Sequence, residues 1–234
     1  MGFSTGAIAR GDFRLALRLL RSHDIDIIEL SALRFEELAP LLAAMPDLGL
    51  KHYSFVSVHA PSSFDLEFES SVIDQLYSLT QRGYPVIVHP NVIFKPVSWR
   101  VLGRNLLVEN MDRRKPIGRT VGEMQQIFDL LPDARFCFDI GHARQVDPSM
   151  TEAWLLLHTF ASRLAEVHIS EVNTSSRHDP ISRNAVTAFR TVAPHIPEHV
   201  PIILEALIDK GQSDILTELQ RAREALSCAG LAVA

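Results

Sequence analysis

Short apolar runs rich in β-branched residues alternate with longer stretches of helical period along the whole chain. Eight of these runs are predicted to be strands, at residues 2–5, 25–30, 55–59, 85–89, 106–110, 135–139, 165–169 and 202–206. Strands that alternate with helices pair in parallel and are joined by right-handed crossovers. The pattern therefore leaves two architectures, an open doubly wound sheet or a closed (β/α)8 barrel.

The intervening stretches predict helices at residues 12–23, 35–45, 71–81, 121–131, 151–163, 183–192 and 214–227. Asp12 and Ser71 are suited to cap the first and third of these, and Pro96 interrupts the segment after the fourth strand. Eight strand–helix units favour the barrel, and no Gly-x-Gly-x-x-Gly follows the first strand as a dinucleotide fold would require. We therefore predict an α/β chain that forms a single (β/α)8 TIM barrel over residues 1–234.

Composition narrows the class of protein. The 234 residues are 47% hydrophobic and 22% charged, which suits one large core, and no Ser/Gly/Pro-rich linker divides them. The net charge of -5 argues against attachment to nucleic acid by charge alone. Two cysteines, Cys137 and Cys228, are too few for a disulfide scaffold. With no signal-peptide core near the first residue and no apolar run of about 18 residues, we expect a cytoplasmic protein without a membrane partner.

The stretch at residues 136–142 has the pattern of a strand that delivers ligands to its carboxyl end. Alternating apolar residues lead into Asp139, Gly141 and His142. We expect Asp139 to end the strand, Gly141 to allow a sharp turn, and His142 to return toward Asp139. A carboxylate and a neutral imidazole together suit a divalent cation.

The same design recurs at the ends of the other predicted strands, which carry Glu29, His59, His89, Glu109, Asp139, His168 and Glu205. In a barrel these ends meet at one face, where the chemistry of the fold is placed. Buried carboxylates that crowd together need cations between them. For Glu109, Asp139, His168 and Glu205 we therefore predict a metal site, whereas pairing of Glu29 with a loop arginine explains that residue equally well.

The order of these residues resembles the xylose-isomerase-like TIM barrels, and within them the endonuclease IV family of metal-dependent apurinic/apyrimidinic endonucleases. The resemblance rests on the segments VHA, VHPN, LLVEN, CFDIGHA, EVHISE and PIILEA, each placed where the family has a strand and its ligand. It implies a common metal site formed by Glu109, Asp139, His168 and Glu205. It also implies that Glu109 bridges to a second metal held by His59 and His89.

For a third metal the resemblance implies His142 and His178. The family has an aspartate two residues before the second histidine, and Ser176 occupies that position here. Asp179 is a candidate to replace the missing carboxylate. Because two ligands are fewer than a tetrahedral shell needs, we expect the third site to be weak.

The resemblance implies two or three divalent ions, with zinc suited to the histidine-rich set and manganese or iron as alternatives. It implies hydrolysis of a phosphate ester, with Glu109, Glu205 and His142 as catalytic residues. The alternative is a sugar or sugar-phosphate isomerase or epimerase, in which Glu109 and Glu205 transfer a proton between carbons. An inactive metal-binding module is the third possibility. The pair His59 and His89 favours the hydrolase, because a one-metal epimerase does not require them.

Cations follow the fifth and seventh strands, and we assign Arg113, Arg114 and Arg177 to substrate binding. Lys115, Arg119 and Arg183 lie in the same loops. The expected partner is a small phosphorylated or sugar substrate, or abasic DNA, although the short loops argue against an extended DNA-binding surface. Trp99 could stack on a base or a sugar, or pack a helix. The sequence leaves the oligomeric state open.

Overall fold

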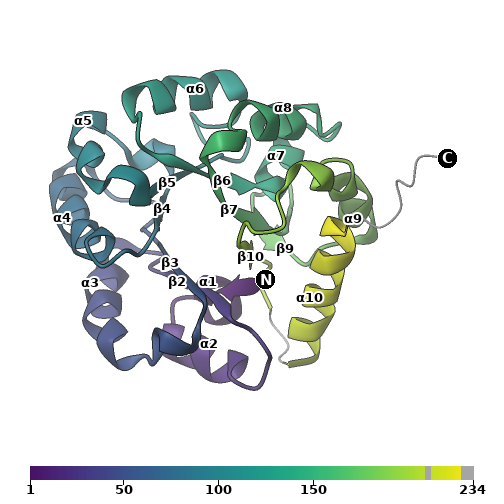
Figure 1. Ribbon diagram of the computed structural model, residues 1–234, viewed down its shortest axis with the longest axis horizontal. Helices are drawn as coiled ribbons and strands as arrows, with labels where there is room; N and C mark the ends of the chain where they lie inside the picture. Colours follow the sequence, from purple (N-terminus) through teal and green to yellow (C-terminus); the bar gives the residue numbers. More distant parts are fainter. Residues whose placement is uncertain (209–211, 228–234) are drawn as a thin grey trace.

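The computed structural model describes residues 1–208 and 212–227, and its centre is a closed barrel of eight parallel strands surrounded by helices (Figure 1). The strands follow one another around the barrel in the order β1-β10-β7-β6-β5-β4-β3-β2. They span β1 Gly2–Ser4, β2 Ile27–Ser31, β3 Phe55–His59, β4 Val86–Val88, β5 Leu106–Glu109, β6 Arg135–Asp139, β7 Leu164–Ile169 and β10 Ile202–Leu204. The (β/α)8 barrel predicted from the sequence is confirmed, and the open sheet is excluded.

The helices that pack around the barrel include all seven that the sequence predicts. They are α2 Phe13–Leu20, α3 Phe35–Ala44, α4 Glu69–Thr80, α6 Val121–Leu130, α8 Thr151–Thr159, α9 Arg183–Arg190 and α10 Gln212–Leu226. Three short helices were not predicted, α1 Thr5–Ala9, α5 Pro96–Trp99 and α7 Ile140–Val146, nor was the small antiparallel pair β8 Glu171–Val172 and β9 His178–Asp179. Within the described part of the chain, every helix lacks the length or the apolar character needed to span a bilayer.

Helix starts follow local hydrogen bonding. The Asp12 side chain accepts from the backbone N–H of Leu15 at 2.8 Å, as predicted for a cap. Ser71 does not cap α4, because a 3-10 turn at Leu66–Phe68 starts the helix two residues earlier, at Glu69. Pro96 interrupts the segment after β4 as expected, and it occupies the first turn of α5, where the missing N–H costs nothing.

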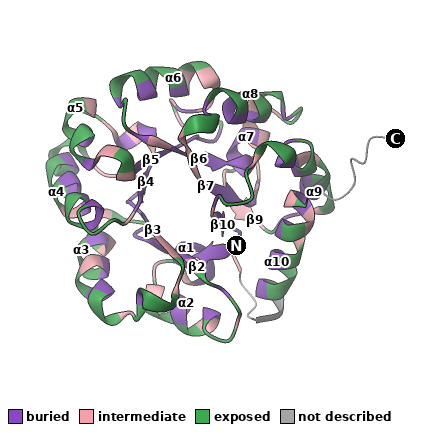
Figure 2. Ribbon diagram, viewed as in Figure 1, coloured by how far each residue is buried: buried purple, intermediate pink, exposed green. Residues whose placement is uncertain are grey.

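Buried residues, purple in Figure 2, occupy the barrel strands and parts of the surrounding helices. The apolar ones among the described residues form two clusters. The larger one lies between the outer face of the barrel and the helices, and includes Phe3, Leu76 and Phe136. The smaller one contains Ile87, Leu107 and Cys137. Burial raises the pKa of the Cys137 thiol well above its usual value, so this cysteine is a packing residue. Cys228 lies outside the described residues.

Trp99 belongs to the core and cannot stack on a substrate. Its side chain is fully buried, and the indole N–H donates to Oε1 of Glu69 at 2.8 Å. The same oxygen accepts the backbone N–H groups of Phe94 and Lys95 at 2.7 and 2.8 Å. This buried carboxylate therefore fixes the segment after β4 onto α4.

Gly141 is required for a reason that differs from the predicted sharp turn. Helix α7 begins directly after β6, so Gly141 lies in the first turn of that helix with an ordinary negative φ. A Cβ atom at this position would lie 2.4 Å from the backbone oxygen of Ser170 and 2.9 Å from Cγ2 of Val172. Glycine thus allows α7 to approach the segment after β7, which brings His142 toward the other strand ends.

We predict that Gly141→Ala destabilises the protein by roughly 1–3 kcal/mol, the range for inserting a group into packed surroundings. Gly122 is the matched control, since it is the second residue of α6 and a Cβ atom added there would meet no described atom within 4 Å. Gly122→Ala should be neutral or stabilising by up to about 1 kcal/mol. Urea unfolding of both variants measures the difference, and equal stabilities would contradict the packing explanation.

Candidate metal centre

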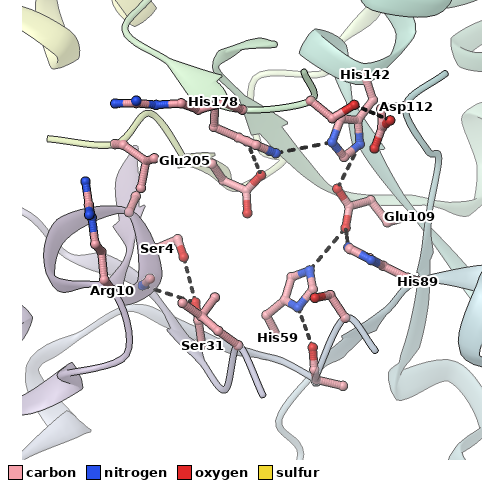
Figure 3. Close-up of a pocket in the computed structure, with 18 of the residues that line it drawn as sticks. Ser4, Arg10, Ser31, His59, His89, Glu109, Asp112, His142, His178 and Glu205 are labelled. Atoms are coloured by element: carbon pink, nitrogen blue, oxygen red, sulfur yellow. Dashed lines mark hydrogen bonds and ion pairs between the residues drawn. The ribbon is translucent and has the colours of Figure 1, made fainter. Parts of the chain in front are cut away.

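The closed barrel gathers the predicted ligands at the carboxyl ends of its strands, around a cavity of about 870 Å³ (Figure 3). His59 and Asp139 end β3 and β6, and Glu109 ends β5. His89 and Glu205 directly follow β4 and β10. The side chains of His59, His89, Glu109, His142, His178 and Glu205 line the cavity, and the fully buried Asp139 and His168 lie next to them.

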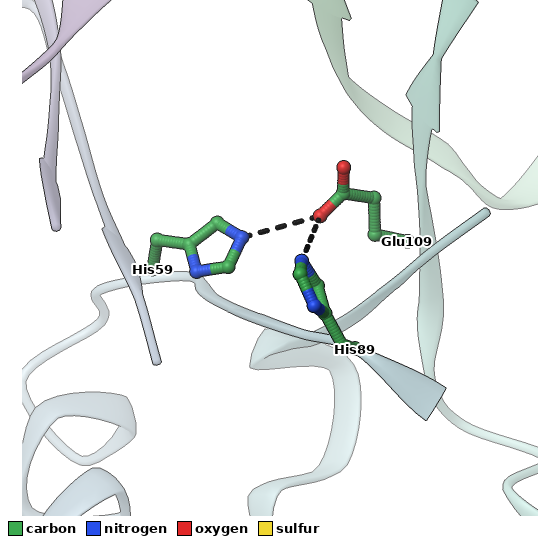
Figure 4. Close-up of side chains that lie close together, drawn as sticks. All are labelled: His59, His89 and Glu109. Atoms are coloured by element: carbon green, nitrogen blue, oxygen red, sulfur yellow. Dashed lines mark hydrogen bonds and ion pairs between the residues drawn. The ribbon is translucent and has the colours of Figure 1, made fainter. Parts of the chain in front are cut away.

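One cluster joins His59, His89 and Glu109 (Figure 4). The Oε2 atom of Glu109 lies 3.2 Å from Nε2 of His59 and 3.2 Å from Nε2 of His89. Nitrogen and oxygen ligands placed tetrahedrally around zinc are separated by about 3.3 Å, given their metal–ligand distances. The donor set and its spacing therefore fit one divalent cation.

A second cluster joins Glu109, Asp139, His168 and Glu205, whose ligand atoms all lie within 4.8 Å of one another. Nδ1 of His168 is 3.4 Å from Oε2 of Glu205 and 3.5 Å from Oε1 of Glu109. Neither Nδ1 of His168 nor Oδ2 of Asp139 has a hydrogen-bond partner among the described residues, although both are buried. Buried polar atoms without partners are costly, and a cation would satisfy them.

Glu109 connects the two clusters through its two oxygens. Oε2 faces His59 and His89, and Oε1 faces His168. Oε1 also lies 3.4 Å from Nδ1 of His142, which belongs to the third cluster. A carboxylate whose oxygens face different ligand sets can bridge two cations.

The third cluster contains Asp139, His142 and His178, one ligand more than the two histidines expected. Nε2 of His142 and Nε2 of His178 face each other at 3.3 Å, which requires a proton or a cation between them. Asp179 does not replace the missing aspartate, because it accepts from Nδ2 of Asn173 at 2.7 Å and pairs with Arg177.

Ser176 is tied to a different carboxylate. Its Oγ donates to Oδ1 of Asp112 at 2.5 Å and accepts from Nε2 of Gln145 at 3.2 Å. Ser176 adopts a left-handed conformation with φ of 56°. The serine therefore orders the loop between β8 and β9 against the loop after β5, and its hydroxyl is held by Asp112 and Gln145.

Backbone acceptors orient the imidazole rings. Nδ1 of His59 is 2.7 Å from the carbonyl oxygen of Ala60, and Nδ1 of His142 is 2.9 Å from that of Asn110. A carbonyl only accepts, so Nδ1 carries the proton in each ring and Nε2 presents its lone pair to the cluster when the ring is neutral. Partners of this kind are typical of metal-ligating histidines.

The crowded charges shift the pKa values of the ligands. Burial opposes ionisation of His59, but its hydrogen bond to Glu109 and the nearby Glu29 and Glu205 outweigh burial and raise its pKa to about 9. Burial dominates for His89 and lowers its pKa to about 4. Burial, together with the charges of Glu109 and Glu205, raises the pKa of Asp139 well above its usual value. A divalent cation can replace the protons that these groups otherwise hold.

The cations predicted to bind substrate are only partly at the cavity. Arg114 and Arg177 line it together with Lys115. Arg113 does not, because its guanidinium donates to the carbonyl oxygen of Val146 at 3.1 Å. Arg119 and Arg183 pair with Glu123 and Glu224 on helices outside the cavity.

The opposite wall of the cavity was not predicted, and Ser4, Arg10 and Ser31 lie there (Figure 3). Arg34, shortly after β2, also lines the cavity. These residues end the first two strands or follow them closely. The two arginines could have been predicted, because each follows a predicted strand, as do the cations after the fifth and seventh strands. Serine at a strand end carries little signal by itself, because serine is common in turns.

We predict that changing His59 and His89 together to alanine removes one metal ion per chain and leaves at least one bound. His23→Ala/His52→Ala is the matched control, because neither histidine belongs to the clusters among the described residues. Metal content per chain, measured by mass spectrometry after zinc loading and desalting, tests this prediction. Loss of all metal, or of none, would contradict the separation into two clusters.

Comparison with known proteins supports the fold. No protein family model and no curated protein matches the sequence. Among solved structures, endonuclease IV from Thermus thermophilus is 18% identical with a TM-score of 0.64, covering 96% of this chain and 98% of that one. A xylose isomerase-like TIM barrel protein from Mycobacterium smegmatis, in complex with magnesium, is 15% identical with a TM-score of 0.58 over 94% and 91%.

A putative sugar phosphate isomerase/epimerase from Anabaena variabilis is 14% identical, with a TM-score of 0.52 over 94% of this chain and 86% of that one. All three likenesses extend over nearly the whole barrel, so no large part of the fold is unmatched. At these identities the likeness concerns the fold and does not separate hydrolase from isomerase. The chain therefore has the fold of the xylose isomerase-like TIM barrels, the group that its sequence motifs resemble.

Proposed function

We propose that the protein is a metal-dependent hydrolase of a phosphate ester, either the phosphodiester at an abasic site in DNA or a small phosphorylated sugar. The position of Glu109 carries the proposal, because its two oxygens face separate ligand clusters. Adjacent cations suit phosphoryl transfer, in which negative charge develops on both the attacking and the leaving oxygen. A one-metal isomerase has no use for the imidazoles of His59 and His89.

The three clusters would hold two or three divalent cations, of which zinc fits the mixed nitrogen and oxygen donors and manganese fits the carboxylate-rich cluster. When bound, the cations supply the electrophilic chemistry of the reaction by neutralising the phosphate charge and making water more acidic. Hydrolysis adds the oxygen of water to phosphorus and breaks the bond from phosphorus to the ester oxygen. The displaced ester oxygen leaves as an alcohol after gaining a proton.

We assign to Glu205 the acceptance of the proton that water loses. Burial opposes its ionisation, but His168 and His178 outweigh burial and lower the pKa of the carboxyl group below its usual value. Its Oε2 lies 3.4 Å from Nδ1 of His178, and its side chain is 13% exposed at the cavity. The lowered pKa keeps Glu205 ionised and able to accept a proton, but it also makes the carboxylate a weak base, so the role requires a water that bound cations have made more acidic. Glu109 and His142 complete the proposed catalytic group. Glu109 would ligate cations in the first and second clusters, and His142 would ligate a cation in the third.

The mouth of the cavity is suited to anions. Arg10 and Arg34 lie on the side of the first two strands, whereas Arg114, Lys115 and Arg177 lie on loops from the other side. Guanidinium groups bind phosphate oxygens with two parallel hydrogen bonds. A phosphate held at the clusters and a second anionic group at the mouth would therefore both find cationic partners, although the chain as a whole carries a net charge of -5.

A sugar or sugar-phosphate isomerase is the second candidate, and one observation favours it. Carboxylate oxygens of Glu109 and Glu205 both face Nδ1 of His168, at 3.5 and 3.4 Å. Two carboxylates on either side of one metal position can transfer a proton between neighbouring carbons of a sugar. The hydroxyl groups of Ser4 and Ser31 across the cavity would suit a sugar as well.

An assay on two substrate classes decides between the candidates. Zinc- or manganese-loaded protein is incubated with an abasic-site duplex and with a panel of ketoses and sugar phosphates. We expect phosphate-ester cleavage, reduced by Glu205→Gln at least roughly 100-fold, as for loss of a positioned acid–base group. Glu218→Gln is the control, because Glu218 is also buried but accepts from the backbone N–H of Ile181 away from the cavity.

The two outcomes are distinct. Strand cleavage or phosphate release that Glu205→Gln abolishes and Glu218→Gln preserves supports the hydrolase. Interconversion of sugars without release of phosphate, abolished by the same substitution, would replace it with the isomerase. Metal binding without either reaction would leave a metal-binding module.

A further inference from the structure

The barrel interior is polar directly beneath the second metal cluster. Glu29 on β2, Ser57 on β3 and Glu166 on β7 are fully buried there. Barrel interiors are usually filled by branched apolar side chains, as Ile87 and Leu107 do here. Two buried carboxylates are costly unless they have partners, so their presence calls for a specific interaction.

That interaction is with His168. Nε2 of this ring makes a hydrogen bond of 3.4 Å with Oε1 of Glu166. Oε2 of Glu29 lies 3.2 Å from the same nitrogen as a charge contact, without a hydrogen bond. The other nitrogen, Nδ1, faces Glu109 and Glu205 in the second metal cluster. Glu29 therefore pairs with a ligand histidine across the barrel, and this contact replaces the pairing with a loop arginine that its sequence position also allowed.

We infer that Glu166 is a positioning residue, which accepts the Nε2–H of His168 and thereby presents the Nδ1 lone pair to the metal, while the carboxylate of Glu29 beside the same nitrogen favours the proton there. The inference rests on the proposed metal centre and assigns a role to a residue outside it. A neutral imidazole carries one proton, so an acceptor at Nε2 leaves Nδ1 free to ligate. Carboxylates that orient a ligating histidine in this way typically change metal affinity by about 10- to 100-fold.

Buried hydroxyl groups hold both carboxylates in place. Oγ of Ser57 donates to Oε1 of Glu166 at 2.9 Å, and Oγ of Ser31 donates to Oε1 of Glu29 at 3.2 Å. Oγ of Ser31 also lies 2.6 Å from Oγ of Ser4, and both serines line the cavity wall opposite Glu109 (Figure 3). A continuous set of contacts thus runs from the far wall of the cavity through Ser31 and Glu29 to the metal ligand His168.

A fourth cation among Glu29, Glu166 and His168 is the competing explanation, since their ligand atoms lie within 4.8 Å of one another. It would require Nε2 of His168 to ligate while Nδ1 ligates the cation of the second cluster. A neutral imidazole has one ring lone pair for ligation, so both nitrogens could bind only after loss of a second proton. The positioning role explains the same contacts of Nε2 with Glu29 and Glu166 without loss of a second proton from the ring.

The test compares substitutions at Glu166 by competition between zinc and a chelator of known affinity. Glu166→Leu keeps the bulk of the side chain and removes the acceptor, whereas Glu166→Gln keeps an acceptor oxygen. Glu69→Gln is the matched control, because Glu69 is equally buried and hydrogen-bonded but lies outside the metal clusters of the described residues. Circular dichroism and thermal unfolding establish that each variant is folded.

We expect Glu166→Leu to weaken one zinc site about 10- to 100-fold and to leave the affinity of the site with His59 and His89 unchanged. Glu166→Gln should weaken it less, and Glu69→Gln should not weaken it. If folded Glu166→Leu keeps wild-type affinity at every site, or if all sites weaken equally, the inference is overturned. A fourth cation would be indicated instead if the wild-type protein bound one zinc ion more than the three clusters account for and the Leu variant lost that ion. Absence of zinc binding by the wild-type protein would overturn the proposed function as well.

A second measurement does not depend on the folding of a variant. Nitrogen-15 NMR of the histidine rings in zinc-loaded wild-type protein, assigned with His168→Gln, reports which ring nitrogen carries the proton. We expect His168 to be protonated at Nε2 and ligated through Nδ1. The opposite arrangement would overturn the inference even if the metal centre itself is present.

Discussion

The arrangement of the cavity depends on one buried carboxylate, Glu109, whose two oxygens face different sets of imidazoles. A carboxylate that is buried to this extent is stable only with positive partners. The neighbouring His89 and His168 outweigh burial and lower the pKa of Glu109 well below its usual value. For Asp139, burial and the charges of Glu109 and Glu205 outweigh the nearby His178 and His168, and its pKa is raised well above its usual value. Neighbouring carboxylates in the centre thus differ in how readily they ionise, and divalent cations would stabilise the ionised form of all of them.

Barrel closure is what makes this density of charge possible. Each parallel strand contributes its final residue to the same face, so side chains far apart in the sequence become neighbours. Beneath this face the interior is divided, with carboxylates on the side of β2 and β7 and apolar residues on the side of β4 and β5. The carboxylates on the polar side contact Nε2 of His168. Among the described residues, the apolar side offers Glu109 no polar contact from below, so its contacts are with imidazoles at the face.

Much of this could be predicted from the sequence because strand period and strand ends are local signals. The last residues of β3 and β6 were placed correctly, and with them His59 and Asp139. Interactions between distant segments could not be read in the same way. Gly141 is needed because of Ser170 after the next strand, and Glu29 because of His168 across the barrel. The sequence shows neither neighbour.

Loop geometry was the least predictable part. Asp179 follows His178 directly, yet Asn173 and Arg177 hold its carboxylate within the β8–β9 hairpin. Arg113 and Arg114 are adjacent in sequence, but only Arg114 lines the cavity, because Val146 accepts the guanidinium of Arg113. A run of cations identifies a charged loop, and the orientation of each side chain depends on acceptors elsewhere in the fold.

Anomalous X-ray diffraction from crystals grown with zinc, measured on both sides of the zinc absorption edge, tests most directly whether Glu109 bridges two cations. We expect one anomalous peak between His59, His89 and Glu109 and another between Glu109, Asp139, His168 and Glu205, with any third peak near His142 and His178 weaker. A single peak, or peaks away from these residues, would show that Glu109 does not bridge two cations.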